Sequence, residues 1–108
     1  MIAKTPVPPY YAVIFTSIRT PADEGYNDMS EKMIDEVKKQ PGFLGFESAR
    51  NEIGITVSYW ADEDSIRKWR INEKHTVARI KGHEKWYQNF KTRICIVKRD
   101  YEWEKEIE

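Results

Sequence analysis

The sequence is poor in the features that identify several large classes of protein. Cys95 is the only cysteine among 108 residues, which excludes an intrachain disulfide and a cysteine-based zinc cage. The 18 lysines and arginines balance 18 aspartates and glutamates, whereas a general nucleic-acid binder needs surplus positive charge. The same balance gives no electrostatic reason to bind an anionic membrane.

Long hydrophobic runs are also missing. No stretch reaches the roughly 20 apolar residues that cross a bilayer. The first residues, MIAKTPVPPYY, lack the apolar centre of a signal peptide. We therefore expect a soluble protein of the reducing cytoplasm, without membrane or nucleic-acid partners.

Motifs for cofactors and metals are absent as well. The sequence has no G-x-G-x-x-G, no P-loop and no nucleophile elbow, so nothing supports flavin or nicotinamide binding. Its two histidines, His75 and His83, lie eight residues apart, which is no recognised ligand spacing. We expect neither a cofactor nor a metal.

What the chain does contain is a regular alternation of strand and helix patterns. Alternating or doubly apolar runs predict strands, and apolar residues at i, i+3 and i+4 predict helices. Pro41-Gly42 ends the first helix, and Asp62 is placed to cap the second. We expect strands at 10–19, 43–49, 53–60 and 90–101, and helices at 23–40 and 62–81 with a bend near Asn72. Residues 83–89 are ambiguous between a helical turn and a loop.

The order β, α, β, β, α, β predicts an α+β fold of the ferredoxin-like type, with one antiparallel sheet and its helices on a single face. The other face would then be exposed, although strands one, three and four place apolar side chains on it. An apolar surface of that size predicts a homodimer that packs two sheets across a two-fold axis. We expect an N-terminal arm (1–9), one domain (10–103) and a charged tail (104–108).

The order and spacing of several residues resemble the antibiotic biosynthesis monooxygenase superfamily. The resemblance covers about residues 10–103, and no single motif decides it. It rests on Pro41-Gly42-Phe43, Gly45, Tyr59-Trp60, Trp69, His75, Gly82, Trp86-Tyr87, Arg99 and Tyr101.

The resemblance implies a dimeric α+β barrel and a cofactor-independent oxygenase acting on a small aromatic or quinol-like substrate. The superfamily also holds haem-degrading members, which use a strand-one asparagine, a helical tryptophan and a later histidine. Trp69 could supply the tryptophan. The first strand offers no asparagine, however, and the position of that histidine falls near Arg79.

Five residues are candidates for the site. His75 is the candidate general base, although a histidine at a helix junction is more often structural. Trp69 could form a pocket wall or belong to the core. Asn72 could reach a cavity or cap a helix. Trp86 and Tyr87 could gate a pocket or attach the loop to the sheet.

Three functional hypotheses stay open. The first is the monooxygenase, in which His75 takes a proton from an aromatic substrate held against Trp69 and Tyr87. The second is a dimer that binds haem or another flat ligand without turnover, or degrades haem with an altered catalytic set. The third is a structural dimer whose core is filled.

Overall fold

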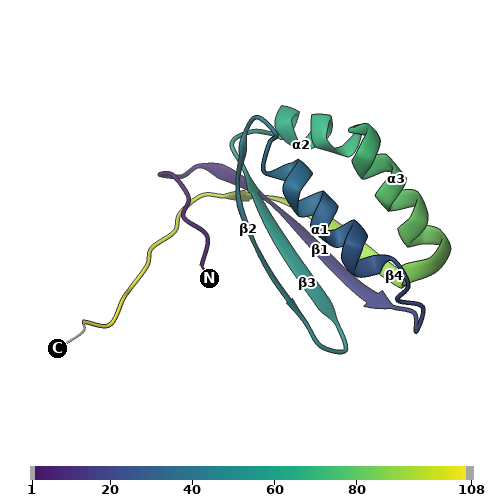
Figure 1. Cartoon of the computed structure of the whole chain (residues 1–108). Helices are drawn as coiled ribbons and strands as arrows, with labels where there is room; N and C mark the ends of the chain where they lie inside the picture. Colours follow the sequence, from purple (N-terminus) through teal and green to yellow (C-terminus); the bar gives the residue numbers. More distant parts are fainter. Residues whose placement is uncertain (1, 107–108) are drawn as a thin grey trace.

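The computed structural model describes residues 2–106, without the side chain of Glu73, and contains four strands and three α-helices. Figure 1 shows the helices gathered on one side of a single sheet. The elements follow in the order β1 (Tyr10–Arg19), α1 (Tyr26–Val37), β2 (Phe43–Arg50), β3 (Gly54–Trp60), α2 (Glu63–Arg70), α3 (Glu73–Lys81), the π-helical turn η1 (Gly82–Trp86) and β4 (Tyr87–Val97). The predicted ferredoxin-like α+β fold is confirmed.

The sheet is antiparallel throughout, with strand order β2-β3-β1-β4. β1 and β3 lie at its centre. Residues directly opposite each other on neighbouring strands share a face of the sheet. On β1, Phe15 pairs with Thr56 of β3 and Thr92 of β4, and Ser17 pairs with Gly54 and Phe90.

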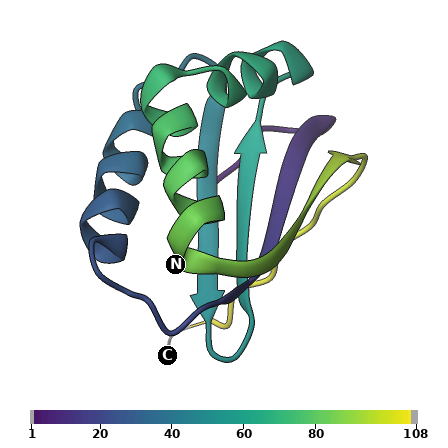
Figure 2. The same ribbon diagram turned by 90° about the vertical axis from the view of Figure 1, so that its right-hand side faces the viewer.

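The two faces of the sheet can be told apart by aromatic contacts. The Phe15 ring of β1 lies 5.4 Å from that of Tyr87, whose ring contacts Tyr26 of α1. Phe15 therefore faces the helices. The opposite face carries Tyr10, Ala12 and Ile14, and we call it the open face because no helix lies on it in Figures 1 and 2.

One end of the open face carries a polar network. The Tyr59 hydroxyl donates to the Glu47 carboxylate at 2.6 Å, and the Ala3 amide donates to the other oxygen of that carboxylate at 2.9 Å. The Tyr10 hydroxyl donates to the carboxylate of Asp100, a residue that follows β4 in the sequence. The N-terminal arm and the C-terminal tail are thus attached to the same end of the sheet.

The helix boundaries follow their capping residues. The Asp62 carboxylate accepts the Ser65 amide at 2.7 Å, which confirms the predicted start of the second helical region. Asn72 caps α3, so the predicted bend is a break between α2 and α3. The first helix is shorter than expected: it begins at Tyr26, not Asp23, after Gly25 in a left-handed conformation. No helix in the described part of the chain combines the length and apolarity needed to span a bilayer.

The second helical region ends where it was expected: α3 stops at Lys81 with Gly82 as its C-cap, and the chain continues into the π-helical turn η1. Two expectations for the last strand were wrong. The last strand begins at Tyr87 instead of Phe90. It ends at Val97 instead of Tyr101, because Val97 pairs with Tyr10, the first residue of β1, and Pro9 before it has no N–H to offer.

Candidate functional site

An aromatic cluster lies between the helices and the β1–β4 half of the sheet. The Phe15 ring contacts Tyr87 and, at 5.3 Å between centroids, Phe90 of β4. Tyr87 also contacts Phe90 at 5.9 Å and Tyr26 at 6.3 Å. Burial, aided by the neighbouring Tyr26, raises the pKa of Tyr87 above its usual value. We call Phe15, Tyr26, Tyr87 and Phe90 the aromatic cluster.

One face of α3 looks toward this cluster. His75, Arg79 and Gly82 are four and three residues apart and so share a helix face. Gly82 is buried against Tyr87, and a β-carbon at Gly82 would stand 2.8 Å from the Tyr87 ring. Glycine is therefore required here by the close approach of the ring, and the face that carries His75 is the one turned to the sheet.

His75 is held against Trp69 across the break between α2 and α3. The two rings are stacked, with centroids 4.5 Å apart and planes 13° from parallel. The Nδ1 atom of His75 lies 3.1 Å from the Trp69 carbonyl oxygen. A carbonyl oxygen can only accept a hydrogen bond, so Nδ1 carries the proton and the lone pair of the neutral ring is on Nε2.

The surroundings of His75 favour its neutral form. Burial lowers the pKa of His75 below the usual 6.5, and the positive charges of Arg79 and Arg70 act in the same direction. The hydrogen bond to Trp69 opposes these effects without cancelling them. At neutral pH the Nε2 atom is therefore an unprotonated base.

Three apolar side chains of β4 are exposed on the helix-facing side of the sheet, with Thr92 between the first and the second. Phe90, Ile94 and Ile96 share the helix-facing side with Phe15, because they pair with Ser17, Val13 and Tyr11 of β1. Their exposed fractions are 42%, 55% and 56%. In Figure 2, β4 forms the edge of the sheet away from α1. An apolar surface on the helix side is thus open to a ligand.

Arg79 adds a charged group to the same helix face. Its Nε atom is buried and has no hydrogen-bond partner among the residues that the structure describes. A buried N–H of this kind is suited to an oxygen atom that carries negative charge. Arg79 was considered in the sequence only as the counterpart of a haem ligand, because its burial depends on how α3 packs.

The remaining predicted site residues have well-defined structural contacts. The Asn72 side-chain oxygen accepts the amides of Lys74 and His75, at 3.0 and 3.2 Å, which fixes the start of α3. Trp86 is 4% exposed, and its ring N–H donates to the Glu24 carbonyl at 3.1 Å. Tyr87 belongs to the aromatic cluster, whereas His83 is exposed. Of the predicted site residues, the structure brings His75 and Trp69 into direct contact and places Tyr87 in the aromatic cluster.

His75 does not line either of two surface hollows. A hollow of about 650 Å³ lies between α1 and α3, and a second of about 300 Å³ lies beside Arg19. Within residues 2–106, no three His, Cys, Asp or Glu side chains are grouped as a metal site would require.

The comparison with protein families decides the affiliation. The sequence model described as "Antibiotic biosynthesis monooxygenase" matches residues 9–80, two thirds of the chain. The chain belongs to this family. The match runs from β1 to α3 and includes Trp69, Asn72 and His75, while Trp86 and Tyr87 lie beyond it.

The chain is also similar to individual proteins, one by sequence and two by structure. The uncharacterised protein YqjZ of Bacillus subtilis (strain 168) is 46% identical over 100 residues, covering 91% of this chain and 88% of YqjZ. The structure of SnoaB, a cofactor-independent oxygenase from Streptomyces nogalater, is similar with a TM-score of 0.73 at 10% identity, covering 86% of this chain and 97% of SnoaB. Protein SO0527 from Shewanella oneidensis has a TM-score of 0.74 at 7% identity, covering 85% of this chain and 94% of SO0527. At these identities the structural likeness concerns the fold.

Proposed function

We propose that this domain is a cofactor-independent monooxygenase that acts on a small aromatic, quinol-like substrate. The observation that carries the proposal is the state of His75: a neutral imidazole whose Nδ1 is bound to the Trp69 carbonyl and whose Nε2 is the base. Family membership and the oxygenase activity of SnoaB, a protein of similar fold, support it.

The substrate would lie against the apolar row of β4. Phe90, Ile94 and Ile96 offer exposed apolar contact, and the ring of Trp69 stacks behind His75. Such surfaces retain flat, apolar ligands, while a few polar groups determine their orientation. Arg79 would face the oxygen atom on which negative charge develops.

The proposed reaction uses molecular oxygen as the oxidant. His75 Nε2 takes a proton from an acidic CH₂ group of the phenolic ring system and leaves a delocalised carbanion. This anion gives its electrons to O₂, so that a carbon–oxygen bond forms and a hydroperoxide results after proton return. Loss of water from the hydroperoxide leaves a carbonyl group. The CH₂ group and O₂ are thus converted to C=O and H₂O.

A second copy of the chain would cover the open face of the sheet. Ile18 and Ile55 on that face are 39% and 42% exposed, and the half-buried pair Ile14 and Val57 lies next to Ile55, farther along the sheet from Ile18. Exposed apolar side chains grouped on one face in this way are typical of interfaces. The homodimer is therefore part of the proposal.

Oxygen uptake with a panel of quinols and anthrone-like phenols tests the activity. We expect turnover that requires no added flavin, haem or metal. His75→Ala lowers the rate by about 10²- to 10⁴-fold, the usual contribution of a general base. The control is Lys68→Ala on the exposed side of α2, which leaves the rate unchanged. Equal rates for the parent and His75→Ala would eliminate the mechanism.

The same apolar row on β4 also suits a flat ligand that is bound and not converted. Its half-exposed isoleucines, Ile94 and Ile96, favour this second candidate. A hemin titration followed by absorption separates the two functions. A stoichiometric complex that survives in reductant and air, together with no quinol turnover, would favour binding over oxygenation.

A further inference from the structure

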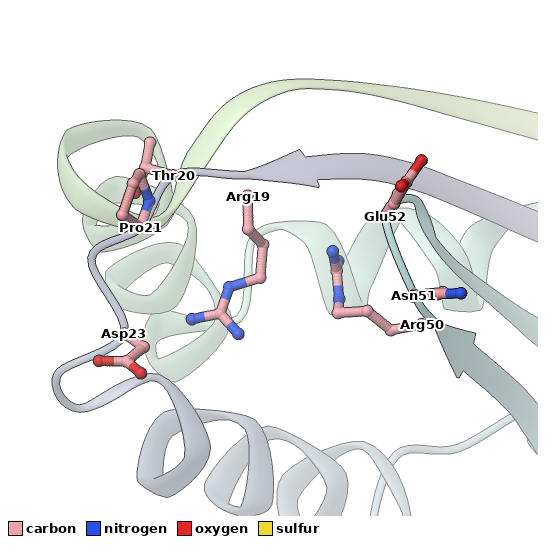
Figure 3. Close-up of a pocket in the computed structure, with 7 residues that line it drawn as sticks. All are labelled: Arg19, Thr20, Pro21, Asp23, Arg50, Asn51 and Glu52. Atoms are coloured by element: carbon pink, nitrogen blue, oxygen red, sulfur yellow. The ribbon is translucent and has the colours of Figure 1, made fainter.

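Two arginines lie together at the end of β1, away from His75. Ser17 and Arg19 share the helix-facing side of β1, and Arg50 reaches across from β2 to donate to the buried Ser17 hydroxyl. Figure 3 shows both arginine side chains among the residues that line one hollow. Two positive charges in one place repel each other unless an anion lies between them.

The guanidinium group of Arg19 is held in place, but none of its contacts with the described residues balances its positive charge. Its guanidinium carbon lies 3.5 Å from the centre of the Tyr26 ring, so one face of the group is occupied. Its Nε and Nη2 atoms are buried and have no hydrogen-bond partner in the described part of the chain. Buried donors are normally paired, so these two N–H edges are suited to an acceptor that the protein itself does not supply.

The hollow next to Arg19 has a volume of about 300 Å³, enough for a small anion. Asp23 and Glu52 also border it, yet neither forms an ion pair with Arg19 or Arg50 among residues 2–106. In Figure 3 the Glu52 carboxylate points away from both guanidinium groups.

The hollow is lined by none of the residues from His75 to Gly82. Seven helical steps from His75 to Gly82 correspond to about 10 Å along the helix axis. Gly82 contacts Tyr87, whereas Arg19 stacks on Tyr26 and pairs with Tyr87, so the hollow adjoins the aromatic cluster.

We propose that Arg19 and Arg50 form an oxyanion-binding site that takes a carboxylate or phosphate group. A guanidinium group presents two parallel N–H bonds that match two oxygens of such an anion. Arg19 offers a buried Nε–Nη2 edge of this geometry. Arg50 adds a second positive charge, oriented by Ser17. The site extends the protein's function beyond oxygenation, because it would bind an anionic ligand independently of His75.

The test is an NMR titration of the full-length protein with sodium phosphate and, separately, sodium acetate, at ionic strength held constant with sodium chloride. We follow the Nε–H signal of Arg19 and the backbone amides of Arg19 and Arg50. Saturable shifts with at least one anion are expected. Saturation by phosphate alone or acetate alone identifies which group the site prefers, and either result supports the proposal.

Four variants make the titration specific. Arg19→Gln weakens binding by about tenfold or more, and Arg50→Lys, which keeps the charge but loses the fork, by several-fold. Arg67→Gln, on the exposed side of α2, changes the affinity by less than about twofold. Asp23→Asn binds as well as the parent or better. Shifts no larger than those caused by chloride, or saturable binding unaltered in both Arg19→Gln and Arg50→Lys, would overturn the proposal.

Discussion

The Nδ1 atom of His75 lies 3.1 Å from the carbonyl oxygen of Trp69, and the two rings are stacked 4.5 Å apart. This pair joins the last turn of α2 to the first turn of α3. Because the carbonyl fixes the tautomer and the stack fixes the ring plane, His75 presents Nε2 in one orientation. A base restrained in this way can act without reorganisation when a substrate binds.

The packing of α3 on the aromatic cluster predicts the effect of Gly82→Ala. A methyl group there would overlap the Tyr87 ring, which is held by Phe15 and Phe90. We expect a loss of about 1–3 kcal/mol in the free energy of unfolding, as overpacking usually causes. Urea denaturation measures it, with Lys81→Ala on the exposed surface as the control. A loss below about 0.5 kcal/mol would contradict this contact.

The effect of Gly54→Ala on the free energy of unfolding should change sign when Arg50 is removed. A β-carbon at Gly54 would overlap the Arg50 guanidinium group, which bonds Ser17. Gly54→Ala in the parent should cost about 1–3 kcal/mol, because it displaces Arg50 and leaves the Ser17 hydroxyl buried and unpaired. In an Arg50→Ala background the same change should stabilise the fold by about 0.4–1 kcal/mol, since alanine restricts the unfolded chain. Equal effects in both backgrounds would show that Arg50 does not lie over Gly54.

The open face predicts the oligomeric state. Light scattering should report a dimer for the parent and a monomer for Ile55→Lys, which places a charge on the open face. Ile80→Lys is the matched control, because Ile80 of α3 is 52% exposed and Ile55 is 42% exposed. A monomeric parent, or dissociation by Ile80→Lys alone, is inconsistent with a sheet-to-sheet dimer.

The Tyr59–Glu47 hydrogen bond predicts a pH dependence of stability. Two hydrogen bonds lower the pKa of Glu47 below 4.5; the bond from Tyr59 has the larger effect and the bond from the Ala3 amide the smaller. The unfolded state therefore binds a proton at higher pH than the folded state. Stability falls as the pH drops below 4.5. Burial and then Glu47 raise the pKa of Tyr59 to about 12, so stability also falls as the pH rises from 10 toward 12.

Tyr59→Phe removes the shared hydrogen bond and reduces both slopes. We expect a loss of about 1 kcal/mol at pH 7 and a flatter stability profile below pH 4.5 and above pH 10. Thermal unfolding at a series of pH values measures the profile, and Tyr101→Phe in the exposed tail is the control. An unchanged profile would mean that this bond contributes nothing to folding.

Most of the fold could be predicted because local patterns coincide with the final elements. Strand β1 and the caps at Asp62 and Asn72 lie where alternation and side-chain chemistry place them. Residues 83–89 were ambiguous because η1 depends on tertiary packing. There Trp86 is buried against Tyr26 of α1, a residue sixty positions earlier in the sequence.

The site could be predicted only in part. The sequence placed Trp69 and His75 in one helical region with a bend near Asn72, whereas their rings meet because the chain breaks between α2 and α3. Arg79 and the β4 row gave no signal of their own. Their sequence is that of an ordinary helix and an ordinary strand, and only the position of α3 shows which side chains remain accessible.

The protonation of His75 is the most direct test of the account. A long-range ¹H–¹⁵N NMR spectrum of the uniformly labelled protein, recorded between pH 4.5 and 8, reports both the tautomer and the pKa, with His83→Ala used for assignment. We predict that His75 is protonated on Nδ1 at neutral pH and titrates below 6.5. A proton on Nε2 at neutral pH, or a pKa above 6.5, would contradict the proposed role of Nε2 as the base.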